Sequence, residues 1–240
     1  MRRFVVALGF LTRLPVPRLA TRDGDFTAAV RLYPLVGLII GAIVAGAGWL
    51  GTQVDPWLGA LAALVAWTWV TGALHLDGLG DLADGLGASH GDRTRLLAVM
   101  ADPHIGSFGV VAIVLQLVAK LVALHLLLPG DCAALLVIPA AARAGPLVWA
   151  RMLLNLKPEG LGAAIADATR ARVLIGWSLV LAGACTLVPA LVAAPVLVLA
   201  LALWFRAKLG GMTGDVHGAG IELTEAGLLL IAATVQALSA

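Results

Sequence analysis

The chain has 240 residues, of which 61% are apolar and only 12% are charged, with a formal net charge of +2. About a quarter of the residues of a typical soluble domain are charged, and a soluble protein of this length has too little interior to bury so much apolar surface. The composition excludes a soluble enzyme, a disordered chain and a nucleic-acid-binding protein. It predicts an all-α integral membrane protein, a polytopic bundle of helices in a lipid bilayer.

The N-terminal segment, residues 1–14, begins with Arg2 and Arg3 and continues with mostly apolar residues. Arg13, Pro15 and Pro17 interrupt it before it is long enough to cross a bilayer. We therefore expect an interfacial or re-entrant helix here, and no cleavable signal peptide.

Seven later stretches are long and apolar enough, or nearly so, to cross the bilayer, which takes about 20 residues each. They are 33–54, 57–75, 107–128, 132–151, 173–189, 194–207 and 224–240. The sixth is short and the seventh reaches residue 240, so whether both cross is left open. We expect about seven transmembrane helices in a single membrane-embedded domain covering residues 1–240, and the sequence does not decide between a monomer and a homo-oligomer.

The charged residues gather on one side of these predicted spans. With the N-terminus inside, 14 of the 16 Lys and Arg residues lie in inner segments or at their membrane edges, and none lies in an outer segment. The positive-inside rule then places the N-terminus in the cytoplasm. Because 12 of the 14 acidic residues lie on the same side, we expect any active site at the cytoplasmic face.

Three aspartates follow the second predicted span at spacings of i, i+4 and i+7: Asp77, Asp81 and Asp84. On an α-helix they share one face over about 10 Å. Such carboxylates repel one another unless a cation joins them, and Mg²⁺, which commonly bridges carboxylates to substrate phosphates, suits them best. The alternative is a solvated helix start, since Asp is a good N-cap.

A second acidic group consists of Asp215, Glu222 and Glu225. Gly218 and Gly220 argue against a regular helix between them, so we expect a loop. The group is either part of a binding site or an ordinary helix entry, in which the glutamates favour the positive N-terminal end of the last span.

The glycine-rich segment 210–214 precedes this group and contains Gly211 and Thr213. Backbone N–H groups in such a segment can approach a phosphate closely, and Lys208 lies just before it. We therefore count these residues as candidates for substrate binding.

Two cations, Lys120 and Arg143, fall inside predicted spans. An ionised group there is costly and normally faces the bundle interior or a watery cavity. We expect these residues to neutralise a phosphate or to pair with the aspartate stripe, and snorkelling is the alternative for Lys120.

Histidines and one more aspartate complete the candidates on the inner side. Asp102 and His104 lie in the segment 100–109, and His75 and His217 lie beside the two acidic groups. Any of the three histidines can move a proton, although a single histidine is more often a hydrogen-bonded residue at a helix end.

Several motifs resemble one known family over nearly the whole chain. The motifs are TRLPVP at 12–17, YPLVGLIIG at 33–41, HLDGLGDLADG at 75–85, MADPHIGSFG at 100–109, EGLG at 159–162 and GGMTGDVHGAGIELTE at 210–225, together with the positions of Lys120 and Arg143. They look like those of cobalamin-5′-phosphate synthases, which are adenosylcobinamide-GDP ribazoletransferases. Gly80 departs from the pattern, since the family commonly has Ala there.

The resemblance implies a Mg²⁺-dependent phosphotransferase of the bacterial inner membrane that acts in vitamin B12 synthesis. It would join adenosylcobinamide-GDP, a corrinoid nucleotide, to α-ribazole or α-ribazole 5′-phosphate, with release of GMP. A metal core of Asp77, Asp81, Asp84 and Asp215 fits this chemistry, with Asp77 the most important. Asp84 and His75 are the candidates for the general base. The remaining candidates would contact substrate: Asp102, His104, Lys120, Arg143, Lys208, Gly211, Thr213, Glu222 and Glu225.

Two other functions compete with this one. A CDP-alcohol-type membrane phosphotransferase also places aspartates at i and i+4, but its pattern resembles Asp-Gly-x-x-Ala-Arg, and no Ala-Arg follows Asp77 and Gly78 here. A transporter would explain the cations inside the spans, but it would need polar groups reaching both faces of the membrane.

Overall fold

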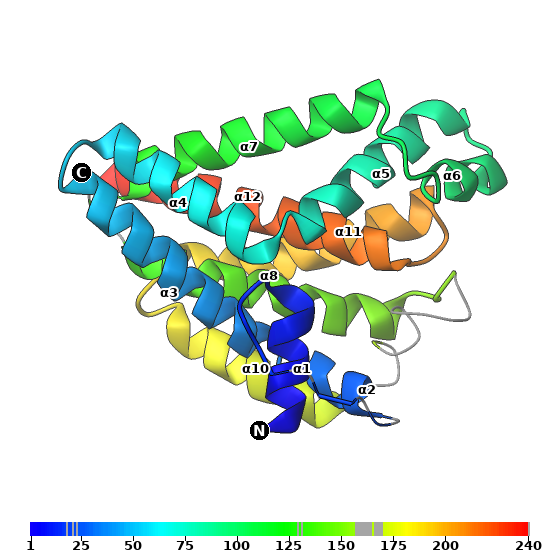
Figure 1. Ribbon diagram of the computed structural model, residues 1–240, viewed down its shortest axis with the longest axis horizontal. Coiled ribbons are helices and arrows are strands. Elements are labelled where there is room, and N and C mark those ends of the chain that lie inside the picture. Colours follow the sequence, from blue (N-terminus) through cyan, green and yellow to red (C-terminus); the bar gives the residue numbers. More distant parts are fainter. Residues whose placement is uncertain are drawn as a thin grey trace.

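The protein is almost entirely helical in the computed structural model (Figure 1). The structure describes residues 1–17, 19–20, 22, 24–128, 130, 132–156, 165 and 170–239. Within these residues the only β-pairing is an isolated bridge between Asn155 and Met212. The all-α fold expected from the composition is confirmed.

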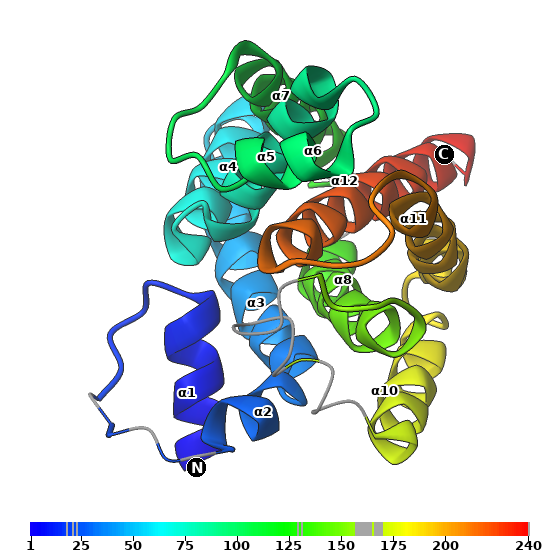
Figure 2. The same ribbon diagram turned by 90° about the vertical axis from the view of Figure 1, so that its right-hand side faces the viewer.

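Twelve helical segments are found in the described part of the chain. They are α1 (Arg2–Leu11), α2 (Asp25–Val30), α3 (Tyr33–Thr52), α4 (Pro56–Thr71), α5 (Leu74–Ser89), α6 (Arg93–Val99), α7 (Ser107–Leu127), α8 (Cys132–Met152), α10 (Ala171–Ala184), the 3₁₀ helix η1 (Pro189–Ala193), α11 (Ala194–Lys208) and α12 (Gly214–Ser239). Helix α3 packs mainly against α4 and α8, and α12 packs mainly against α5, α7 and α8. Figure 2 shows α12 lying among these neighbours and α11.

Five helical segments of the described chain are long and apolar enough to cross a membrane: α3, α7, α8, η1 with α11 (Pro189–Lys208), and α12. Helices α4 and α5 form a sixth candidate if they are counted as one broken span. The expected stretch 173–189 corresponds to α10, an apolar helix of only 14 residues. The estimate of seven spans is therefore approximate.

The outer surfaces of the long helices are apolar. On α7, for example, Val111, Leu115 and Val118 are each at least half exposed, whereas Gln116 and Lys120 on the opposite face are buried. A helix whose exposed side is apolar and whose buried side is polar is suited to lipid rather than water. The polar side chains in the middle of α7 therefore point into the bundle.

Helix α1 lies across the direction of the long helices, and the two views agree on this (Figures 1 and 2). Phe10, in its last turn, stacks at 6.1 Å on Tyr33, the first residue of α3. This arrangement brings the N-terminal segment against the bundle.

The chain turns sharply between α4 and α5, whose axes differ by 85°. Gly72 (φ 60°) and Ala73 (φ 57°) both adopt the left-handed conformation at this break. That conformation is unfavourable for alanine, and such strain is characteristic of functional sites. The break ends the second predicted span early and places His75 and Asp77 in the first turn of a new helix.

The segment before Glu222 is helical, which corrects the loop expected there. Helix α12 begins at Gly214 and continues through Gly218 and Gly220. These glycines are tolerated because neighbouring groups pack directly on them: a Cβ at Gly218 would lie 3.3 Å from the Cα of His75. The helix buries Glu222 and Glu225 inside the bundle.

Candidate active site

A pocket of about 230 Å³ lies where the first turns of α5 and α12 meet. We refer to it as the α5–α12 pocket. Its polar side chains are Tyr33 on α3, His75 and Asp77 on α5, and Asp215 and His217 on α12, and α1 and α8 add an apolar wall. The complete lining is Phe10, Leu11, Tyr33, Leu74, His75, Asp77, Pro146, Ile165, Gly214, Asp215, His217, Gly218 and Ile221.

Close packing of two helices brings the carboxylates of Asp77 and Asp215 to this pocket. A Cβ at Gly78 would lie 2.5 Å from the backbone oxygen of Asp215, so only glycine permits this approach. The helix spacing of the pocket therefore depends on the glycine that follows Asp77.

Thr213 and Asp215 form the beginning of α12. The backbone N–H of Val216 donates to Thr213 Oγ1 at 3.3 Å, which is a helix N-cap contact. Asp215 stands in the first turn, near the positive end of the helix. The hydroxyl of Thr213, a substrate-binding candidate, therefore caps the helix. It also lies 3.4 Å from Asp215 Oδ2.

Asp84 lies away from the pocket. Its carboxylate accepts hydrogen bonds from the backbone N–H groups of Gly106 at 2.7 Å and Gly109 at 2.9 Å, at the beginning of α7. Asp81 is not among the lining residues either. The structure therefore brings together two of the four carboxylates expected in the metal core, Asp77 and Asp215.

No three His, Cys, Asp or Glu side chains form a possible metal cluster within the described residues. A site made of protein ligands alone is therefore not found in that part of the chain. Two carboxylates facing one pocket do suit a Mg²⁺ ion that takes its other ligands from phosphate oxygens and water.

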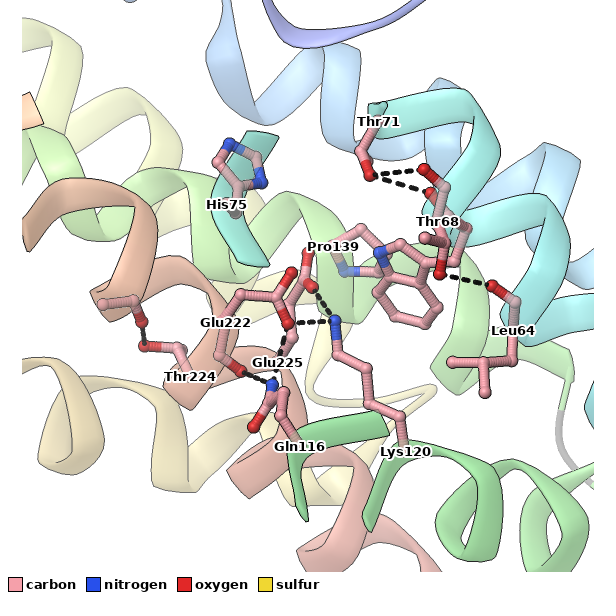
Figure 3. A network of polar contacts seen from close by, with 12 residues as sticks. Leu64, Thr68, Thr71, His75, Gln116, Lys120, Pro139, Glu222, Thr224 and Glu225 are labelled. Atoms are coloured by element: carbon pink, nitrogen blue, oxygen red, sulfur yellow. Dashed lines mark hydrogen bonds and ion pairs between the residues drawn. The ribbon is translucent and has the colours of Figure 1, made fainter. Parts of the chain in front are cut away.

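Deep in the bundle, Lys120 contacts Glu222 and Glu225 of the second acidic group (Figure 3). Arg143, the other cation inside a predicted span, contacts Glu225. Lys120 Nζ lies 2.6 Å from both Glu222 Oε2 and Glu225 Oε2. Arg143 Nη1 lies 2.7 Å from Glu225 Oε1. All four side chains are at most 3% exposed, and their formal charges cancel. We call these four residues the buried charge cluster.

Gln116 and Trp67 also contact this cluster. Gln116, one helical turn before Lys120, donates to the side chain of Glu222 at 2.8 Å and to its backbone oxygen at 2.7 Å. The ring of Trp67 lies 4.5 Å from Lys120 Nζ, a cation–π contact. The cluster joins α7, α8 and α12, and Trp67 adds a contact from α4. The expectation that its cations pair with the aspartate stripe is therefore wrong, since their partners are the glutamates of α12.

Arg143 also connects the cluster to the pocket. Its Nη2 lies 3.4 Å from Nδ1 of His75, a residue that lines the pocket and is only 4% exposed. The candidate substrate contact Arg143 is itself fully buried. We therefore expect Arg143 to influence a substrate in the pocket through its contact with His75.

The other candidates lie outside the pocket. Asp102 and His104 contact each other at 2.7 Å in the exposed connection between α6 and α7. Hydrogen bonds from the backbone and the imidazole of His104 lower the pKa of Asp102 below its ordinary value. Lys208 is exposed at the end of α11, and Gly211 is buried beside Leu156. The EGLG motif at 159–162 lies outside the described residues.

Tyr33 is a pocket residue that the site assignment from sequence missed. Its hydroxyl and Nδ1 of His217 are buried and have no hydrogen-bond partner in the described structure, although buried polar groups almost always have one. Tyr33 is the only tyrosine of the chain and begins a recognisable motif, which is the signal that could have identified it.

Comparison with known proteins gives one consistent result. A family model described as cobalamin-5-phosphate synthase matches residues 3–233. Adenosylcobinamide-GDP ribazoletransferase from Novosphingobium aromaticivorans is 56% identical over 96% of this chain and 95% of its own length. The proteins of the same name from Thiobacillus denitrificans and Laribacter hongkongensis are 50% and 49% identical, over at least 96% of each chain. No solved structure matches.

Proposed function

The chain belongs to the cobalamin-5-phosphate synthase family, and on that premise we propose that it is an adenosylcobinamide-GDP ribazoletransferase whose α5–α12 pocket is the transfer site. A hydroxyl of α-ribazole, or of its 5′-phosphate, forms a bond to the corrinoid-side phosphorus, the bond from that phosphorus to GMP breaks, and the hydroxyl proton is released. Such transfer depends on positioning and charge neutralisation more than on a covalent intermediate.

The observation that carries this proposal is the convergence of Asp77 and Asp215 on one pocket from two motifs 138 residues apart in the sequence. We propose that they hold Mg²⁺ together with phosphate oxygens of the substrate. A magnesium ion bound there would neutralise the pyrophosphate and stabilise the leaving GMP. The two carboxylates alone would repel the pyrophosphate, so the proposal requires the cation.

The size of the pocket limits what it encloses. Clefts for drug-sized ligands usually measure about 300–1,000 Å³, and this one measures about 230 Å³. It has room for the reacting phosphates and part of the acceptor, while the corrin ring stays outside. The hydroxyl of Tyr33 and the imidazole of His217 are suited to bind the acceptor, because both line the pocket and lack partners in the described structure.

The distribution of charge supports a cytoplasmic site in the bacterial inner membrane. The α5–α7 connection and the α11–α12 turn lie at the same end of the molecule, opposite the C-terminus (Figure 1). Arg93, Arg95, Arg206 and Lys208 belong to this end. Because Lys and Arg concentrate on the cytoplasmic side of membrane proteins, we propose that this end faces the cytoplasm.

The test is release of GMP from adenosylcobinamide-GDP and α-ribazole by the purified protein in lipid nanodiscs. We expect activity that requires Mg²⁺, a large loss in Asp77→Asn, and a higher Mg²⁺ requirement in Asp215→Asn. Asp55→Asn is the matched control, since Asp55 caps α4 and asparagine caps equally well. Normal activity of Asp77→Asn would contradict the proposed site, and activity in EDTA would contradict the magnesium.

A further inference from the structure

Arg143 is held on two sides, which fixes the direction of its guanidinium. Nη1 donates to the backbone oxygen of Pro139 at 2.9 Å and to Glu225 Oε1 at 2.7 Å. Nη2, the other terminal nitrogen, is therefore directed at Nδ1 of His75, 3.4 Å away. The side chain is fully buried, so it has no room to turn elsewhere.

This contact decides which nitrogen of His75 carries the proton. A guanidinium has five N–H donors, no acceptor, and stays charged in proteins. In a hydrogen bond between Arg143 and His75, Arg143 must donate and Nδ1 must accept. In the neutral imidazole the single proton is then on Nε2. A proton on Nδ1 would place two donors against each other, and a doubly protonated imidazolium would add a second positive charge.

The protonated nitrogen is the one available to the pocket. His75 makes its one hydrogen bond to the described residues through Nδ1, so none of them occupies Nε2. The imidazole lines the pocket together with Asp77 and Asp215. In a pocket whose two carboxylates repel phosphate oxygens, an N–H group is a neutral donor that attracts them.

We infer that Arg143 is a positioning residue that fixes the Nε2–H tautomer of His75, and that His75 donates a hydrogen bond to a phosphate oxygen of the substrate. This inference rests on the proposed function of the pocket. It gives His75 a role different from the general base expected from the sequence, because a nitrogen that already carries a proton cannot remove one from a hydroxyl.

Three substitutions at position 75 test whether His75 acts as a hydrogen-bond donor through Nε2, as a donor through Nδ1, or as a base. A glutamine amide places its NH₂ near the position of Nε2, and an asparagine amide places it near Nδ1; neither amide acts as a base. Loss of a donor to a developing charge typically lowers kcat by about 10²–10³-fold. We expect a loss of that order in His75→Ala and His75→Asn, and a kcat within about tenfold of the unsubstituted chain in His75→Gln.

The control for this series is His90→Asn, at the exposed residue after α5. Thermal unfolding of each variant shows whether a loss of activity reflects a loss of folding. A glutamine variant that is folded and as inactive as the alanine variant would overturn the inference, as would better recovery by asparagine than by glutamine.

A second measurement does not depend on activity. Nitrogen NMR of the chain labelled with ¹⁵N-histidine in nanodiscs reports the protonated nitrogen directly, with His75 assigned by its absence in His75→Gln. We expect a proton on Nε2 only, and a mixture of tautomers in the charge-balanced double variant Arg143→Gln/Glu225→Gln. Protonation of Nδ1 in the unsubstituted chain would overturn the inference even if GMP release is normal. If no GMP is released while Nε2 carries the proton, the proposed function fails and the Arg143–His75 relationship stands.

Discussion

Asp84 and Gly109 join α5 to α7, because the backbone N–H of Gly109 donates to Asp84 Oδ1 at 2.9 Å. The other carboxylate oxygen accepts from the N–H of Gly106 at 2.7 Å. Both donors lie where α7 begins, where N–H groups lack partners inside the helix and the helix dipole favours a negative charge. This contact gives Asp84 a structural role that its place in the aspartate stripe did not reveal.

Replacing Asp84 by alanine should therefore lower stability. The buried N–H of Gly109 and the partly buried N–H of Gly106 lose a charged acceptor, which costs about 2–3 kcal/mol, whereas asparagine keeps one acceptor and should lose less. Thermal unfolding in detergent or nanodiscs measures both variants. Unchanged stability of Asp84→Ala together with an altered Mg²⁺ requirement would instead make Asp84 a metal ligand.

The buried charge cluster predicts a compensating pair of substitutions. Lys120→Met leaves Glu222 without its cation, and breaking a buried pair typically costs about 3–5 kcal/mol. Lys120→Met/Glu222→Gln removes both charges, so we expect it to be more stable than Lys120→Met alone. Unfolding temperatures of the two single variants and the double variant provide the measurement. Strictly additive losses would show that the charges do not interact.

The hydroxyl of Tyr33 should contribute to binding rather than to stability. Because it is buried and has no partner in the described structure, Tyr33→Phe should leave stability unchanged or raise it by about 1 kcal/mol. If the hydroxyl binds the acceptor, the KM for α-ribazole should rise several-fold while the KM for adenosylcobinamide-GDP stays near its original value. A clear loss of stability would mean that the hydroxyl has a structural partner.

The break between α4 and α5 predicts opposite effects at adjacent positions. Ala73 has φ 57°, a conformation that glycine adopts without strain, so Ala73→Gly should stabilise the fold by about 1 kcal/mol. Gly72→Ala should destabilise it, because its φ is also positive and a Cβ there would collide with the side chain of Arg13. The comparison of the two unfolding temperatures checks both expectations.

The proposed orientation predicts a periplasmic C-terminus. The end of α12 lies at the opposite end of the molecule from the basic connections (Figure 1). Alkaline phosphatase fused after Ala240 should therefore be active in cells, and green fluorescent protein fused there should stay dark. The reverse result would place the α5–α12 pocket outside the cytoplasm.

Patterns within single helices were predictable from the sequence. The apolar stretches gave α3, α7 and α8 to within a few residues, because a lipid-facing helix must be apolar over its whole length. The i, i+4, i+7 spacing correctly placed Asp77, Asp81 and Asp84 on one helix. The different surroundings of Asp77 and Asp84 could not be predicted. Those of Asp84 depend on the N–H groups at the start of α7, and those of Asp77 depend on the approach of α12.

The beginning of α12 shows why local rules failed there. Glycine is a poor helix former in isolation, so Gly218 and Gly220 suggested a loop. In the structure these positions bring α12 against His75 and Trp149, and packing outweighs intrinsic preference. In the same way, the positions of Lys120 and Arg143 indicated buried partners, but only the fold identifies Glu222 and Glu225 as those partners.

The buried charge cluster also constrains how the protein is made. Lys120 and Arg143 enter the membrane on α7 and α8, whereas both glutamates enter later, on α12. Until α12 arrives, two cations stand in the bilayer without their counter-ions, at a cost of about 2.5–3.5 kcal/mol each. The two cations of α7 and α8 therefore gain their counter-ions only when α12 has entered the membrane and packed against them. A chain truncated before Glu222 would lack both counter-ions, so we expect α7 and α8 to be less stable in the bilayer than they are in the complete protein.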